Sequence, residues 1–352
     1  MKRLASIFSA LIIAVAIAVV PYGTAQAQSS AALSITPKKN YTIQPGKSAR
    51  DGLTIRNMDS ERTLNLNLSV IDFSFKDDGG TPDLMLAPDA PQTAWSIKPF
   101  VKLQSKTVNI PPRESKTINI TINVPKGQGA GSYYSAIVYS SGTPEGGNVG
   151  LSASGVTLAF VDVPGKTVED LKLEHFGAYR QEKAGRAAKF LRLAINKPQN
   201  MAYSLKNSGN VAEAPVGTIT LRHMFGQEVR INDINTLKSL ALRGQTRTFV
   251  TCIATKDTHL ELTGEERSNA KVCTEPTLWP GLYTASLDAY YGQNGNTTKE
   301  LTGTSWFIYA PLWFIILLAI VILAIAFLVW KIVHGTKNKK RTVKGRKAAL
   351  RR

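Results

Sequence analysis

The strongest constraint on how this chain folds is a run of 23 residues, Ile308–Trp330, that contains no charged side chain. As a helix rising about 1.5 Å per residue it reaches roughly 34 Å, enough to cross a hydrocarbon core of about 30 Å. Fifteen of these residues are Leu, Ile, Val or Phe, which favour insertion into a bilayer. A buried core helix is the alternative, but the basic run that follows favours the membrane. We predict a transmembrane helix over residues 306–330.

Aromatic side chains flank this run at both ends. Trp306, Tyr309 and Trp313 lie near its start, and Trp330 closes it. Amphipathic rings are enriched where a membrane helix meets the lipid headgroups. We therefore predict that these four residues anchor the helix at the two membrane interfaces.

The formal net charge of +18 is concentrated at the ends of the chain. The tail, residues 331–352, carries ten Lys or Arg and no acid, and Lys2 and Arg3 add two more, which leaves +6 for the rest. A basic cluster beside a membrane helix marks the cytoplasmic side and attracts anionic lipid. We therefore place the tail in the cytoplasm and expect anionic lipid, not nucleic acid, as its partner.

Residues 1–27 have the features of a secretory signal peptide. Met1–Arg3 is basic, Leu11–Val20 is apolar, and Ala25–Ala27 is a small-x-small cleavage site. We predict cleavage after Ala27, with an uncleaved signal anchor as the alternative. The chain then crosses the plasma membrane once, with its N-terminal domains outside and its tail inside.

Between Ser29 and Thr304 the dominant pattern is alternation of apolar and polar residues. Leu64–Val70 and Thr117–Val124 each place four aliphatic side chains on one face and Asn, Ser or Thr on the other, as expected for strands with one side in a core. No amphipathic helix of three turns is evident. Short strands separated by turn residues predict an all-β fold of two tandem Ig-like antiparallel β-sandwiches.

Two landmarks recur along the chain and suggest an internal duplication. Leu53–Asn57 resembles Tyr203–Asn207, and Gly131–Tyr133 resembles Gly281–Tyr283. The distance along the chain from the first landmark to the second is the same in both copies, since Asn57 to Tyr133 and Asn207 to Tyr283 are each 76 residues. We predict a first sandwich over residues 28–165 and a second over 166–305. Extra segments fall at different places, around Phe75–Phe100 in the first unit and over residues 251–276 in the second.

Both cysteines of the chain, Cys252 and Cys273, lie in the second extra segment. An even number of cysteines in an exported region favours a disulfide, and two free thiols are the alternative. A metal site is disfavoured because no CxxC or paired His spacing accompanies them.

The sequence offers few candidates for site chemistry. Asp77, Asp78 and Asp83 form an acidic, glycine-containing loop that is a weak candidate for a calcium site, although the same residues are common in turns. Among the aromatic residues, a ring pair exposed on a strand would suit glycan or partner contact. The candidates are Tyr134, Tyr139, Tyr290 and Tyr291. No catalytic motif or cofactor-binding loop is present, so no catalytic residue or cofactor is predicted.

Several stretches match the pattern of a known family. They are Ser34–Pro37, Gln44–Gly46, Leu53–Asn57, Asn109–Pro125 and Gly131–Tyr139 in the first unit, and Leu205–Val211, Pro215–Ile219, Phe225–Gly226, Leu242–Phe249 and Pro280–Ala285 in the second. With Trp306–Pro311 leading into the helix, the chain resembles the WxL-interacting proteins of Gram-positive bacterial surfaces. The cysteine-bearing segment and Phe75–Phe100 depart from that pattern.

This resemblance implies a bacterial cell-envelope protein with a peptidoglycan-binding first sandwich and a second sandwich that binds a surface protein. We therefore expect a non-enzymatic scaffold whose partners are cell-wall polymer or a surface protein. A structural accessory subunit of a membrane complex is the alternative. A cell-wall hydrolase is a remote third. It stays open because paired catalytic carboxylates are close in space and cannot be recognised from their spacing in the sequence.

Overall fold

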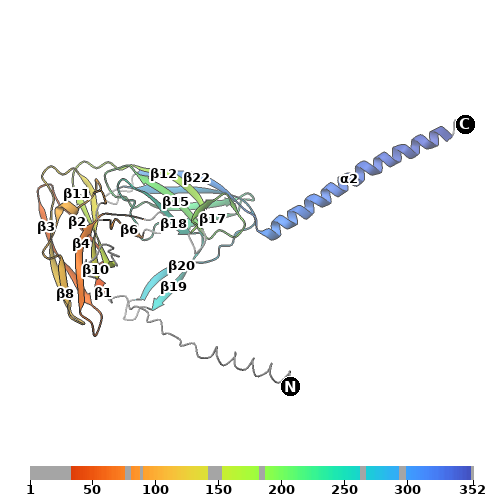
Figure 1. Ribbon diagram of the computed structural model, residues 1–352. Coiled ribbons are helices and arrows are strands. Elements are labelled where there is room, and N and C mark those ends of the chain that lie inside the picture. Colours follow the sequence, from red (N-terminus) through yellow and green to blue (C-terminus); the bar gives the residue numbers. More distant parts are fainter. Residues whose placement is uncertain are drawn as a thin grey trace, which may run out of the picture.

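The computed structural model describes residues 33–75, 81–87, 90–141, 153–181, 187–261, 267–292 and 299–349. It contains two β-sandwiches in tandem and a C-terminal helix that leaves the second sandwich (Figure 1). The predicted all-β fold with one terminal helix is confirmed. The predicted signal peptide lies outside the described residues.

The first sandwich packs a four-stranded sheet against a five-stranded sheet. The first sheet has the order β1 (Leu33–Ile35), β3 (Ser48–Asn57), β9 (Ser115–Asn123), β7 (Val101–Leu103), and the second has the order β2 (Lys38–Thr42), β11 (Ala153–Val163), β10 (Gly131–Ser141), β4 (Leu64–Ile71), β8 (Thr107–Ile110). Alternation explains the core between them: Leu64, Leu66 and Leu68 are buried from one sheet, and Ile118, Ile120 and Ile122 from the other.

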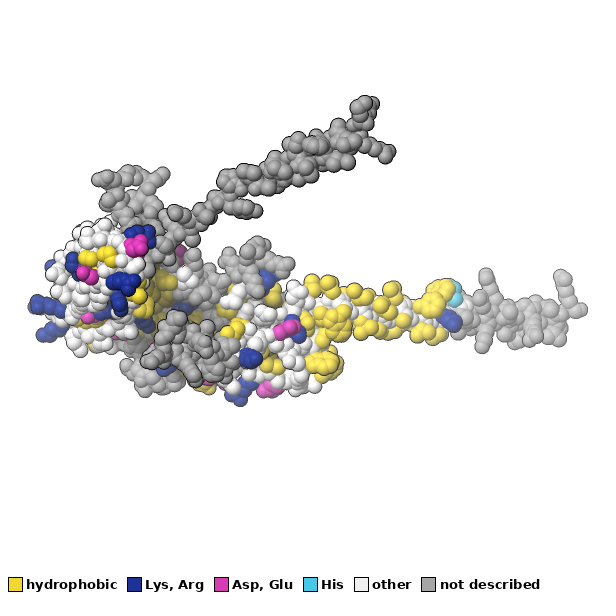
Figure 2. Space-filling model, turned by 90° about the horizontal axis from the view of Figure 1, so that it is seen from below, with side chains coloured by type: hydrophobic (Ala, Val, Ile, Leu, Met, Phe, Trp, Pro, Cys, Tyr) yellow, Lys and Arg dark blue, Asp and Glu magenta, His cyan; other side chains and the backbone are white. Residues whose placement is uncertain are grey.

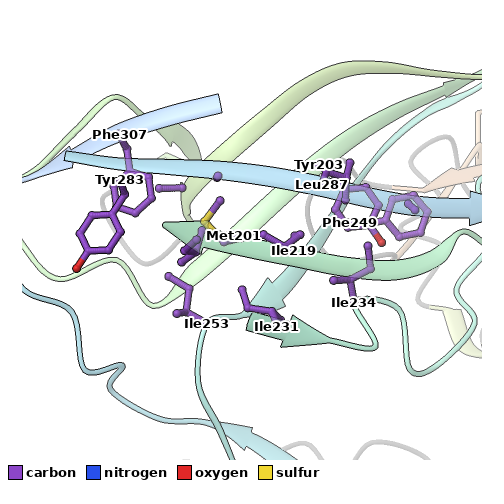
Figure 3. Packing of buried hydrophobic residues seen from close by; sticks show 14 of the residues in the cluster. Met201, Tyr203, Ile219, Ile231, Ile234, Phe249, Ile253, Tyr283, Leu287 and Phe307 are labelled. Carbon is purple, nitrogen blue, oxygen red and sulfur yellow. The ribbon is translucent and has the colours of Figure 1, made fainter. Parts of the chain in front are cut away.

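The second sandwich repeats this arrangement. Its four-stranded sheet has the order β13 (Lys189–Leu191), β12 (Leu171–Arg180), β15 (Asn200–Asn207), β18 (Thr246–Cys252), and its five-stranded sheet has the order β14 (Leu193–Ala194), β22 (Lys299–Tyr309), β21 (Gly281–Tyr291), β16 (Val216–His223), β17 (Glu228–Asn232). Figure 3 shows its core, where Met201 and Phe249 from one sheet approach Ile219 and Leu287 from the other.

Each sandwich contains one parallel pair, so the sheets are not wholly antiparallel as predicted. β2 runs parallel to β11, and β14 runs parallel to β22. Early in each unit the chain crosses from the four-stranded sheet to the edge of the five-stranded sheet. It does so from β1 to β2 in the first unit and from β13 to β14 in the second. That crossing makes the first strand of the second sheet parallel to the last strand of the unit.

Three small elements lie outside the two paired sheets. In the first unit, β5 (Phe73–Phe75) pairs with β6 (Pro82–Leu84), and the 3₁₀ helix η1 (Lys98–Phe100) precedes β7. In the second unit, β19 (Thr255–Glu261) and β20 (Arg267–Cys273) form a hairpin. A disulfide joins Cys252 to Cys273, with 5.4 Å between their Cα atoms, at the base of this hairpin.

The C-terminal helix, α2, runs from Leu312 to Ala349. The prediction that it begins at residue 306 is wrong, because β22 continues to Tyr309 and pairs with β21 over its whole length. An apolar run does not by itself distinguish a strand from a helix. Within α2, Leu312–His334 is long and apolar enough to span a membrane, with a mean hydropathy of 3.3, and it is not buried against the rest of the described chain. The helix also continues past the predicted end at Trp330 into the basic tail.

The two sandwiches meet through a third apolar cluster. Phe73, Tyr134, Val138 and Phe160 of the first unit pack with Leu242 of the second. The outer face of the first five-stranded sheet is therefore covered at this point by a loop of the second unit and by the first unit's own extra segment.

Candidate functional site: an open sheet edge in the second sandwich

The two four-stranded sheets are offset by one strand, because β7 extends the first sheet beyond β9 and β13 extends the second beyond β12. In the first sandwich β9 lies between two strands, β3 and β7. In the second sandwich β18 pairs with β15 on one side, and within the described part of the chain no strand pairs with its other side. An unpaired strand edge presents backbone N–H and C=O groups that another extended segment can pair with.

Hydrogen-bond register shows that β9 and β18 are equivalent. The backbone N–H of Asn57 donates to the carbonyl of Glu114 at 2.9 Å, and that of Asn207 donates to the carbonyl of Gln245, also at 2.9 Å. β9 and β18 begin directly after these two acceptors. Because β7 pairs with Ile120–Ile122 in the first unit, the corresponding open edge in the second unit is Thr251–Ile253.

A cleft of about 720 Å³ lies along this edge. One side is formed by residues 247–255, which include most of β18, and the other by residues 230–237 and 239, at the end of β17 and just after it. β17 is itself the outer strand of the facing sheet, and among the described strands it pairs with β16 alone. The cleft therefore lies between two sheet edges, and the buried side chains of Ile231, Ile234 and Ile253 point into the core behind it (Figure 3).

One end of the cleft contains a buried cation, Arg247. Its Nη1 donates to the carbonyl of Leu240 at 2.6 Å, and its guanidinium lies over the rings of Phe75, at 4.3 Å, and Phe249, at 5.1 Å. Nε has no hydrogen-bond partner among the described residues, and burial lowers the pKa of Arg247 to about 10. This end of the cleft is thus suited to an acceptor such as a backbone carbonyl or a carboxylate.

The disulfide fixes the other end of the cleft. Cys252 is the last residue of β18, and its bond to Cys273 attaches the β19–β20 hairpin there. The extra segment over residues 251–276 therefore adds a hairpin beyond β18. The first unit's extra segment precedes β9 and leads directly into β7, the strand that covers the edge of β9. The order of these insertions along the sequence was the signal that could have identified the open edge.

The predicted tyrosine platform is wrong for three of its four residues. Tyr134, Tyr139 and Tyr291 are buried, the first at the contact between the sandwiches and the other two in the cores. Tyr290 alone presents its ring, with 39% of the residue exposed. Alternation showed that neighbouring rings face opposite ways but could not show that the second sandwich covers Tyr134.

The acidic loop is only partly placed. Asp77 and Asp78 lie outside the described residues, and Asp83 is in β6, opposite Ser74. Among the residues that the structure describes, no group of three His, Cys, Asp or Glu side chains is arranged to hold a metal ion.

The four predicted membrane anchors fall in different environments. Trp313 and Trp330 are exposed on α2, and Trp306 is exposed on the outer face of β22. Tyr309 is buried in the core of the second sandwich, so its prediction as an interface anchor is wrong. Period-two alternation in β22 turns Phe307 and Tyr309 inward and Trp306 and Ile308 outward.

No protein-family model and no curated protein matches this sequence. Among solved structures, it is similar to the class 5 fimbriae chaperone CfaA at 12% identity, over 80% of this chain and 100% of that chain, with a TM-score of 0.34. The E. coli chaperone DraB matches at 11% identity, over 80% and 97%, with a TM-score of 0.32. The Pseudomonas aeruginosa CupB2 chaperone matches at 8% identity, over 75% and 96%, with a TM-score of 0.28. The likeness concerns the fold class alone.

Proposed function

We propose that this chain is a membrane-tethered, non-enzymatic envelope protein whose second sandwich binds an extended segment of a partner protein along β18. The observation that carries the proposal is the open edge at Thr251–Ile253, at a position that the first sandwich covers with its own β7. Strand addition of this kind derives affinity from backbone hydrogen bonds and specificity from alternate side chains.

β7 indicates which chemistry suits the edge. Its residues Val101 and Leu103 are half-buried against the first core, and Lys102 between them is exposed. A segment with two aliphatic residues separated by one polar residue would make the same contacts beside Thr251–Ile253. The positive charge of Arg247 at the other end of the cleft would also favour an acceptor group in the segment.

The tether is Leu312–His334 of α2, whose length and apolar composition suit a bilayer. In this proposal the two sandwiches lie on the cell-wall side of a bacterial plasma membrane and the basic tail lies in the cytoplasm. The resemblance to WxL-interacting proteins supports a surface protein as the partner of the second sandwich and peptidoglycan as the ligand of the first.

Site-specific photo-crosslinking tests the binding edge. A photoreactive residue at Thr251 in the full chain, expressed in its own envelope, is expected to crosslink to a protein, whereas the same residue at exposed Asn65 of β4 is not. Equal labelling from both positions, or none from Thr251, would contradict the proposal. A crosslinked integral membrane protein in equal amount would identify the chain as an accessory subunit instead.

Co-sedimentation with insoluble peptidoglycan tests the first sandwich separately. Detergent-solubilised full chain is expected to pellet with purified cell wall more than a control membrane protein does. Equal recovery in the supernatant would remove the peptidoglycan ligand and leave the edge proposal intact.

A further inference from the structure

Exposed hydrophobic side chains gather at the end of the second sandwich from which α2 leaves. In the described parts of the two sandwiches, thirteen large hydrophobic residues are exposed, and eight of them lie at this end. Figure 2 shows hydrophobic side chains there that continue onto the helix. Six of the eight come from three loops or strand ends: Leu193, Ile195, Met224, Phe225, Trp279 and Leu282.

We call the surface formed by these exposed residues the helix-proximal end. Strand register brings its segments together. Leu193 lies opposite Ile308, and Gly281 lies opposite Tyr309. The backbone N–H of Met224 donates to the carbonyl of Leu282 at 2.9 Å. Segments 193–197, 223–227 and 279–282 therefore surround the point where β22 ends.

The connection to α2 is too short to lift this surface away from a membrane. The chain is still paired to the sheet at Ala310, whose N–H donates to the carbonyl of Ala194 at 2.9 Å, and α2 begins at Leu312. Three residues from Tyr309 to Leu312 span at most about 10 Å. The headgroup layer on each side of a bilayer is about 5–8 Å thick, so the helix-proximal end must reach it if α2 spans the membrane.

The chemistry of the surface suits that layer. Phe225 and Trp279 are 81% and 61% exposed at the tips of their loops. Arg192 lies 5.0 Å from the ring centroid of Trp306 and donates to its carbonyl at 3.0 Å, which places a cation beside an amphipathic ring, as at membrane interfaces. The nearby carboxylates Glu228 and Glu275 are paired with Arg222 and Lys197.

A contiguous exposed apolar surface of this kind marks an interaction site on a soluble domain. We infer that the helix-proximal end inserts its exposed aromatic and aliphatic side chains into the interfacial layer of the bilayer. The second sandwich is thereby held at a fixed height and tilt above the bilayer. This inference rests on the proposed span by α2 and adds a second, peripheral contact to it.

Depth-dependent fluorescence quenching tests the contact. The full chain carries its two cysteines in a disulfide, so Phe225→Cys and Trp279→Cys each provide one site for a nitrobenzoxadiazole label. The matched control is Leu237→Cys, because Leu237 is 88% exposed in the same sandwich. Leu237 lies at the end of the sandwich opposite to α2, just after the point where the N–H of Ile234 donates to the carbonyl of Gly217. Ile320→Cys reports on α2 itself.

The labelled chains are reconstituted in phosphatidylcholine–phosphatidylglycerol nanodiscs with lipids that carry a nitroxide near the headgroup or in the acyl chain. Labels at positions 225 and 279 are expected to lose most of their fluorescence to the headgroup-proximal nitroxide and little to aqueous iodide, and the label at 237 the reverse. Labels at 225 and 279 that behave like the one at 237 would overturn the inference. If the label at 320 is also insensitive to acyl-chain nitroxide, the membrane span fails as well, so the two failures are distinguishable.

Discussion

The hydroxyl of Tyr134, buried on the first sandwich, accepts a hydrogen bond of 2.9 Å from Nε2 of Gln245 on the second. The same hydroxyl donates to the carbonyl of Arg243 at 3.1 Å, and Oε1 of Gln245 accepts the N–H of Phe75 at 3.2 Å. Polar groups at this contact thus satisfy one another across the two units. Together with the apolar cluster around Phe73 and Leu242, they join the sandwiches into one body.

Replacing Gln245 tests this coupling. Gln245→Ala leaves the N–H of Phe75 without its acceptor and removes one of the two hydrogen bonds of the Tyr134 hydroxyl. An unsatisfied buried group costs about 1–3 kcal/mol. We expect the unmodified full chain in detergent to unfold in a single calorimetric transition. In Gln245→Ala this transition should shift to lower temperature and broaden toward two. Gln227→Ala, in an exposed turn, is the control; equal melting of the two variants would show that the bonds do not couple the units.

Asn57 and Asn207 occupy equivalent places and are expected to be equally intolerant of change. Each is buried at the end of a strand, its amide donates to backbone carbonyls at 2.7–3.1 Å, and its Oδ1 accepts a backbone N–H two residues on. Truncation to Ala leaves several buried groups unpaired, so each variant should lose about 2–4 kcal/mol of unfolding free energy.

Chemical denaturation of the full chain measures this loss. Asn65→Ala, on the solvent face of β4, is the matched control and should change little. A loss at only one of Asn57 and Asn207 would indicate that the two turns are not equivalent in energy, whatever their geometry.

The sequence predicted the fold better than the site. Alternation at Leu64–Val70 and Thr117–Val124 identified strands because one face of each is buried in a core. The start of α2 was misplaced because Ile308 and Tyr309 are apolar in either a strand or a helix. The open edge of β18 was missed, since which strand ends a sheet depends on pairing between distant segments. Its trace in the sequence was the order of the two insertions, not a local pattern.

Removing the disulfide should loosen the hairpin while leaving the first sandwich folded. Closing a loop of about 20 residues stabilises a fold by about 3 kcal/mol on the chain-entropy model, and here the loop is the β19–β20 hairpin. Cys252→Ser with Cys273→Ser is expected to expose residues 255–273 to limited proteolysis. Reductant should reproduce this pattern in the unmodified chain and have no effect on the double variant; identical digestion with and without the bond would contradict the prediction.

Glu213 should make the second sandwich less stable as pH rises. Its carboxyl is buried. Oε2 accepts the N–H of Gly292 at 3.1 Å, and Oε1 has no partner in the part of the chain that the structure describes. Burial, with the charge of Glu169, raises the pKa of Glu213 from 4.5 to about 7. Because the folded state holds the proton more tightly, this group's stabilisation is full below about pH 4.5 and is lost as pH rises to about 7, a change of about 3 kcal/mol.

Glu213→Gln keeps an acceptor for Gly292 and removes the titration. We expect this variant to be more stable than the unmodified chain at pH 8 and to show a smaller difference between pH 5 and pH 8 in urea unfolding. Glu228→Gln, an exposed carboxylate paired with Arg222, serves as the control and should leave the pH dependence of the unmodified chain in place. If Glu213→Gln retains the full difference between pH 5 and pH 8, another group is responsible for it.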